Sequence, residues 1–186
     1  MDLLRNFDNI HTHVLEGPKA ICSVPPRKAM ELCRDGGNQP YSIELHPWNA
    51  GKDLLEEFNE AIDFCKDDSN FIAIGECGLD SICDTDMSVQ EECFVAALQA
   101  GKRLNKPMII HIVRAWDKLL KLIDEYGDTE ISPIVIHGYR KNETFAQQLV
   151  KKGFYLSLGK KYNEEVPKLI PADRIFHETD EITEEK

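Results

Sequence analysis

Short apolar runs alternate with stretches that place apolar residues at helical spacing along most of this chain. Apolar runs of about four to six residues between helical stretches are typical of buried parallel strands. We predict eight strands, at residues 7–13, 20–24, 41–45, 71–76, 108–112, 134–137, 154–158 and 174–180. Helical periodicity predicts helices at residues 26–33, 52–66, 88–104, 116–126 and 142–152.

Two helix starts carry capping signals. Ser88 with Glu91 matches a capping box, and Asn142 precedes the last predicted helix. Alternation of strands and helices implies a parallel sheet, and eight strands suggest a closed TIM-like (β/α)8 barrel. With 186 residues, against about 250 in a typical barrel, we expect a compact form. The first helix would be reduced and the final helix missing, in a single domain spanning 1–186.

Composition narrows the possible partners. With 33 acidic against 22 basic residues, the net charge of −11 argues against a broad basic surface that coats nucleic acid. An enzyme with a few local cations remains compatible with this charge. The six cysteines form no C-x-x-C pair, which favours reduced thiols and a cytoplasmic location. We see no signal peptide and no run long enough to span a membrane.

Side chains of the kind that bind metals follow several of the apolar runs. They are His11, His13, Glu76, His111, His137 and Asp180. In α/β barrels the chemistry lies at the C-terminal ends of the strands, so these residues would converge on one rim. Each alone has an ordinary structural explanation, such as a packed histidine or a buried ion pair. Together they favour divalent cations that support hydrolysis.

Strand alternation refines this picture at two places. Glu76 lies on the same alternation as Ile72 and Ile74, so we expect it to point into the barrel. Glu178 and Asp180 share one strand face, and either could reach the rim. These placements predict a carboxylate-rich centre among the histidines.

Cations also follow the predicted strands. Arg114 comes three residues after His111, and Arg140 comes three residues after His137. Arginine binds phosphate oxygens in a bidentate manner, so both could contact a phosphate-bearing substrate. The alternative is that they pair with nearby acidic side chains on a solvated surface.

Seven stretches, in order, resemble the TatD-related metal-dependent hydrolases, a branch of the amidohydrolase-like barrels. They are His11-Thr12-His13, Leu45-His46-Pro47-Trp48, 73–80, 107–111, 136–140, 155–159 and Glu178-Thr179-Asp180. The G-E-x-G-L-D pattern within 73–80 is the most specific of them. The short spacing between His13 and His46 resembles compact members from Bacteroidetes-type bacteria.

The resemblance implies a phosphodiesterase, typically a deoxyribonuclease acting on DNA or another phosphodiester, with two divalent ions (Mg²⁺, Mn²⁺ or Zn²⁺). By motif position, one ion would be held by His11, His13 and Asp180, the second by His111 and His137, with Glu76 bridging both. Asp180 would also accept a proton from the attacking water. His46 would support substrate binding.

Two alternative functions stay open. Amidohydrolase relatives that cleave C–N or ester bonds often carry a carboxylated lysine at the place of Glu76, so this glutamate favours phosphodiesters. A degenerate, non-catalytic metal-binding barrel is the other, because the chain departs from the family pattern. Glu44 stands where relatives commonly have glycine, and Glu181-Ile182 replaces Ala-Pro. The missing last helix would also leave an apolar flank, through which a homodimer could form.

Overall fold

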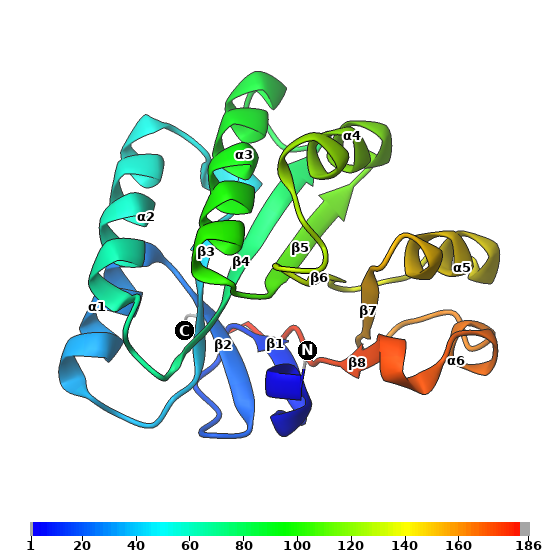
Figure 1. Ribbon diagram of the computed structural model, residues 1–186, viewed down its shortest axis with the longest axis horizontal. Helices are drawn as coiled ribbons and strands as arrows, with labels where there is room; N and C mark the ends of the chain where they lie inside the picture. The colour runs from blue at the N-terminus through cyan, green and yellow to red at the C-terminus, as the bar shows by residue number, and fades with distance from the viewer. Residues whose placement is uncertain (1, 183–186) are drawn as a thin grey trace.

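Eight strands pair in parallel and in chain order, so each strand lies beside its sequence neighbours (Figure 1). The computed structural model describes residues 2–182. The strands are β1 Asn9–Thr12, β2 Ala20–Val24, β3 Tyr41–Leu45, β4 Phe71–Asp80, β5 Met108–Val113, β6 Ile134–Ile136, β7 Tyr155–Leu158 and β8 Ile175–His177. All eight predicted strands are confirmed: β2 and β3 have the predicted bounds, and the other six have shifted ends.

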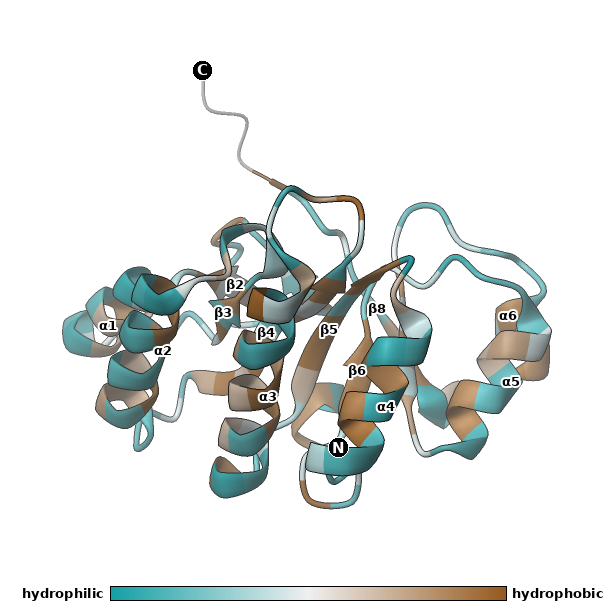
Figure 2. Ribbon diagram, turned by 90° about the horizontal axis from the view of Figure 1, so that it is seen from above, coloured by the Kyte–Doolittle hydropathy of each residue, from teal (hydrophilic) through white to brown (hydrophobic). Residues whose placement is uncertain are grey.

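Helices follow most strands and cover the outside of the sheet (Figures 1 and 2). They are α1 Pro26–Asp35, α2 Lys52–Cys65, α3 Met87–Leu104, α4 Trp116–Tyr126, α5 Glu143–Lys151 and α6 Val166–Leu169. Three short 3-10 helices, η1 Asp2–Asn6, η2 Pro47–Asn49 and η3 Ala172–Arg174, complete the elements of the described residues. The sequence patterns did not predict α6 or the 3-10 helices, which are too short to show a helical period.

One of the two predicted helix caps is confirmed. The Asn142 side chain accepts a hydrogen bond from the backbone N–H of Phe145 at 2.9 Å. The prediction that Ser88 begins a capping box is wrong. Helix α3 begins at Met87 and follows Asp86, so Ser88 lies inside the first turn instead of before it.

The apolar core has two parts. The larger part lies between the sheet and the helices, with Ile43 and Phe58 among its members. The smaller part fills the barrel interior, where Ile21, Ile109 and Val135 pack together. Alternating strand residues therefore serve both sides of the sheet, which explains why the strands read as nearly continuous apolar runs.

The barrel closes between β1 and the segment that follows β8. The backbone N–H of Asp180 donates to the carbonyl of His11 at 3.1 Å, and that of His13 donates to the carbonyl of Glu181 at 2.8 Å. We predicted that the last strand runs to Asp180, but it ends at His177. The residues after it still reach the rim, because these backbone bonds hold them against β1.

Two positions of the barrel have no helix within residues 2–182. Residues 13–19, between β1 and β2, contain no helix, and no helix follows β8 within the described residues. A single domain over 1–186 and a homodimer through the uncovered flank stay predictions. Among the helices of residues 2–182, none combines the length and apolar character needed to cross a lipid bilayer.

Candidate metal centre

The two histidines of the first strand region face one carboxylate. Nε2 of His11 lies 3.3 Å from Oε2 of Glu76, and Nε2 of His13 lies 3.4 Å from the same oxygen. Asp180 approaches from the closing segment, with Oδ1 at 3.5 Å from His11 and 3.9 Å from His13. The spacing of two residues therefore brings both rings to one place.

The other oxygen of Glu76 faces three more histidines. Oε1 lies 2.7 Å from Nδ1 of His111, 3.0 Å from Nε2 of His137 and 3.5 Å from Nε2 of His46. Glu76 is almost fully buried, at 3 % exposure. Its carboxylate thus lies between two groups of imidazoles, one group at each oxygen.

A bulge in β4 turns Glu76 into the barrel. Ile43 of β3 pairs with Ile74, whereas Leu45 pairs with Cys77, so β4 advances three residues while β3 advances two. Ile74 packs in the outer core, and the alternation argument that placed it on the same face as Glu76 is wrong. The inward direction of Glu76 follows from the extra residue.

The two carboxylates after β8 have different positions. Glu178 is buried, and its Oε1 lies 3.1 Å from Nδ1 of His137 and accepts the backbone N–H of Gly138 at 2.8 Å. The Asp180 side chain is 34 % exposed and faces His11. Asp180 therefore faces the centre directly, while Glu178 contacts the ring nitrogen of His137 that points away from Glu76.

Burial and close contacts shift the acid–base behaviour of the centre. Burial alone would raise the pKa of Glu76, but His137 and the contacts with His11 and His111 lower it well below its usual range. Burial would lower the pKa of His13, but Glu44 and Glu76 raise it to about 10. Without metal, the surrounding carboxylates favour the protonated forms of His11, His13 and His137, whose pKa values are all raised.

The donor set fits divalent cations. Both ring nitrogens of the buried His11 lack a hydrogen bond of acceptable geometry, although carboxylate oxygens lie nearby. A cation among these atoms would satisfy lone pairs that hydrogen bonds leave unused. Four groups have ligand atoms within 4.8 Å of one another: His11, Glu76 and His137; His11, His13 and Asp180; His46, Glu76 and His111; and His137, Glu178 and Asp180.

His46 is oriented as a hydrogen-bond donor. It precedes η2, and its Nδ1 accepts the backbone N–H of Trp48 at 3.2 Å. A neutral ring with an accepting Nδ1 carries its proton on Nε2, the atom that faces Glu76. This tautomer offers an N–H to the centre instead of a ligand lone pair.

Asp80 is a site residue that we did not single out. Its Oδ2 lies 3.2 Å from Nε2 of His111 and accepts the indole N–H of Trp48 at 2.7 Å. The aspartate ends the G-E-x-G-L-D stretch, so the sequence did contain the signal. Sequence reasoning assigned it no role because its strand was expected to end at Glu76.

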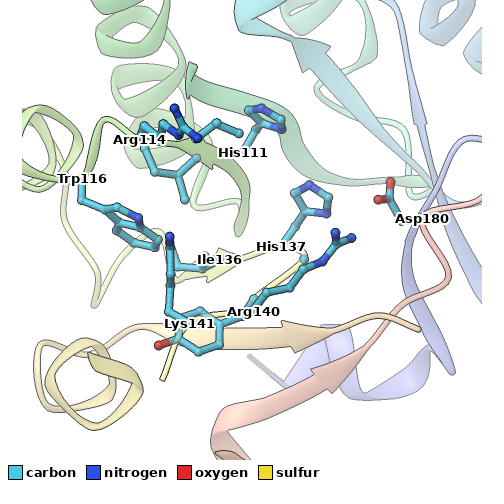
Figure 3. Close-up of a pocket in the computed structure, with 12 residues that line it drawn as sticks. His111, Arg114, Trp116, Ile136, His137, Arg140, Lys141 and Asp180 are labelled. Carbon is cyan, nitrogen blue, oxygen red and sulfur yellow. The ribbon is translucent and has the colours of Figure 1, made fainter. Parts of the chain in front are cut away.

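Two adjoining hollows open onto the centre and share His111, His137 and Asp180. One, of about 360 Å³, is also lined by Arg114, Arg140 and Lys141. Figure 3 shows Arg140 extended toward His137 and Asp180, with Arg114 beside His111. Within residues 2–182 neither arginine forms an ion pair, contrary to the alternative that they pair with nearby acids.

The second hollow, of about 400 Å³, is lined by Glu44, His46 and Trp48. Trp48, at its rim, is 60 % exposed. The centre is therefore open to solvent from two sides, one basic and one acidic and aromatic. This access suits a ligand larger than water.

Eight parallel strands with histidines and carboxylates gathered at their C-terminal ends define an α/β barrel with a metal-type centre. The sequence model of the TatD related DNase family matches residues 23–184, and the chain belongs to this family.

Similar proteins agree with this assignment. The uncharacterized metal-dependent hydrolase YabD of Bacillus subtilis is 32% identical over 161 residues, which cover 82% of this chain and 62% of YabD. The 3'-5' ssDNA/RNA exonuclease TatD of Escherichia coli K12 is 28% identical, covering 83% of this chain and 62% of that protein. The chain thus spans about three-fifths of the length of these curated relatives.

A solved structure confirms the fold. The crystal structure of YjjV, a TatD homolog from Escherichia coli K12, superposes with a TM-score of 0.77 at 20% identity. The match covers 96% of this chain and 80% of that one. The barrel predicted from the strand pattern is therefore confirmed.

Proposed function

We propose that this protein is a metal-dependent hydrolase that cleaves phosphodiester bonds in nucleic acid, most simply a deoxyribonuclease. The observation that carries the proposal is the convergence of five histidines on Glu76, beside a hollow lined by two arginines that form no ion pair within residues 2–182. The name of the E. coli relative, an exonuclease of single-stranded DNA and RNA, supports the same substrate class.

The residues present fit two divalent ions, of Mg²⁺, Mn²⁺ or Zn²⁺. His11, His13 and Asp180 would hold one, and His111 and His137 the other, with Glu76 between them. When bound, such ions lower the pKa of water and stabilise the negative charge that develops on phosphate oxygens.

Asp180 is the proposed proton acceptor. Its side chain is 34 % exposed, so water reaches it from the open side of the centre. Although burial would raise its pKa, the contact with His11 and the charge of His137 lower it. The carboxylate is therefore ionised near neutral pH and can take a proton from an attacking water.

Arg114, Arg140 and His46 are proposed to bind the substrate. The two arginines offer guanidinium N–H groups to phosphate oxygens in the 360 Å³ hollow. His46 offers its Nε2 proton to an oxygen from the opposite side. Since the net charge is −11, attraction of DNA would come from this rim and not from the surface as a whole. Six free cysteines support the cytoplasmic location that completes the proposal.

The test uses purified protein stripped of metal, with a single-stranded oligonucleotide and bis(p-nitrophenyl) phosphate as substrates. We expect no turnover without metal, recovery with Mg²⁺, Mn²⁺ or Zn²⁺, and loss of the recovered activity in Asp180→Asn. A matched control is Asp173→Asn, a change of the same kind in the exposed η3 helix.

Other outcomes identify the competing functions. Hydrolysis of an amide or ester substrate, with no cleavage of either phosphodiester, would indicate an amidohydrolase-like enzyme. Metal binding without turnover of any of these substrates would indicate a non-catalytic barrel. Either result would overturn the phosphodiesterase proposal.

A further inference from the structure

His13 is held between two carboxylates that contact opposite ring nitrogens. Oε1 of Glu44, on β3, lies 3.2 Å from Nδ1, while Oε2 of Glu76 lies 3.4 Å from Nε2. Nε2 is also the nitrogen nearest Asp180. The ring therefore has one nitrogen facing the centre and one facing away from it.

This orientation decides which nitrogen can bind a cation. A neutral imidazole has a proton on one nitrogen and a lone pair on the other, and only the lone pair binds metal. A carboxylate at Nδ1 accepts a hydrogen bond only if the proton stays on Nδ1. The lone pair then remains on Nε2, which faces Glu76 and Asp180.

We propose that Glu44 is a positioning residue that fixes the tautomer and ring orientation of His13 for metal binding through Nε2. The inference rests on the metal centre of the proposed function and assigns it a residue beyond the ligands. Glu44 does not touch the ion or the substrate in this role, because its contact is with the outward nitrogen.

The strand places Glu44 for this contact. Tyr41, Ile43 and Leu45 pack in the outer core, so the residues between them point to the inner face of β3. The Glu44 side chain is 14 % exposed and lines the second hollow at the rim. His13 is its one ion-pair partner within residues 2–182. The contact is thus set by strand geometry and is not one of several surface alternatives.

The same arrangement occurs on the other side of the centre. His137 directs Nε2 to Glu76 at 3.0 Å, and its Nδ1 lies 3.1 Å from Glu178. Two histidines that face the opposite oxygens of Glu76 are therefore both supported by a carboxylate at Nδ1. Such partners orient metal-bound histidines and increase their basicity, and their loss typically weakens metal affinity about 10- to 100-fold.

The experiment measures Zn²⁺ affinity by isothermal titration calorimetry, with no substrate present. We expect Glu44→Ala to weaken the affinity of the ion at His13 by about 10- to 100-fold. Glu44→Gln keeps an oxygen that accepts a hydrogen bond from Nδ1, so the loss of Zn²⁺ affinity in this variant should be clearly smaller. Glu165→Gln is the matched control: it removes one exposed charge away from the centre, from a side chain that pairs with Lys168 at 2.7 Å, and should leave affinity unchanged.

A second measurement needs no variant. Histidine ring ¹⁵N NMR of the Zn²⁺-loaded native protein should show His13 with its proton on Nδ1 and the metal on Nε2. The reverse assignment would overturn the proposal, including in the case that Glu44→Ala fails to fold.

The remaining outcomes separate the two proposals. Native Zn²⁺ affinity in Glu44→Ala would refute the role of Glu44 and leave the hydrolase intact. Equal losses of Zn²⁺ affinity in Glu44→Ala and Glu44→Gln would show that Glu44 acts only through its charge. This result would also refute its role in fixing the tautomer of His13. Failure of the native protein to bind Zn²⁺ would remove the metal centre and this inference together.

Discussion

Glu178 and His137 form a close pair, with Oε1 of the buried Glu178 3.1 Å from Nδ1 of His137, and the same oxygen also accepts the backbone N–H of Gly138. Glu178→Ala should therefore lower kcat/KM on bis(p-nitrophenyl) phosphate by about 10- to 100-fold, since His137 loses its orientation. His177→Ala, at the exposed neighbouring position, is the control and should retain activity. Equal activity in both variants would contradict a supporting role for Glu178.

Arg140→Ala should raise KM for the oligonucleotide roughly tenfold or more, because a charge-assisted bond to phosphate is lost. Zn²⁺ affinity should stay unchanged, since Arg140 lines the hollow but is not among the ligand groups. Arg103→Ala removes an equal charge from α3, where Arg103 pairs with Asp63, and should leave KM unaltered. A fall in kcat with constant KM would argue against phosphate binding by Arg140.

The metal-free protein should be most stable between about pH 4.5 and 6.5. The pKa of His13 rises from an ordinary 6.5 to about 10, so its stabilisation is complete below about pH 6.5 and is lost as pH rises toward 10. Glu76 and Asp180 have pKa values below the ordinary 4.5 and 3.8. Their stabilisation is complete above about pH 4.5 and is lost as pH falls further.

Thermal unfolding in the presence of EDTA, followed across this pH range, measures the effect. Above pH 6.5 the stability of the metal-free protein should fall, whereas its affinity for Zn²⁺ should increase, because the cation must displace protons from the imidazoles. A melting temperature of the metal-free protein that rises steadily to pH 9 would contradict the assigned protonation states.

Gly78→Ala should destabilise the protein by ~3 kcal/mol or more. Gly78 has a φ of +143°, and an added Cβ would lie 2.0 Å from the backbone oxygen of His111. Gly37→Ala is the control, because no heavy atom lies within 4 Å of its added Cβ. Urea unfolding at a fixed metal concentration gives both free energies, and similar values would show that β4 and β5 can separate at this point.

The sequence was sufficient to predict the barrel because its signals are periodic. Strands such as Met108–Val113 and helices such as Trp116–Tyr126 lie where apolar spacing placed them. Strand ends were less predictable, because they depend on pairing with neighbours. Strand β4 runs to Asp80 since Gly78 to Asp80 continue the ladder to β5, and no local pattern shows this.

The ligand candidates could also be predicted, but their supporting residues could not. Strand order implies that His11 and Asp180 meet, because β1 and β8 are the first and last strands of a closed barrel. The contact of Glu44 with His13 crosses from β3 to the end of β1, over the intervening β2. Such a contact depends on strand stagger and side-chain reach, which apolar spacing does not encode.

The barrel closes where the first strand region meets the segment after β8. His11 and His13 come from the first of these and Asp180 from the second. A cation shared by these residues would cross-link the first strand region to the segment after β8 and so close the loop formed by residues 11–180. Because the ion would be bound by residues on both sides of this gap, β1 and β8 could separate only with the loss of a ligand, so ion binding should slow their opening. The backbone hydrogen bonds of His13 and Asp180 bridge that gap. Hydrogen exchange at these two amides should therefore become slower when the ion binds, at ion concentrations too low to change global unfolding.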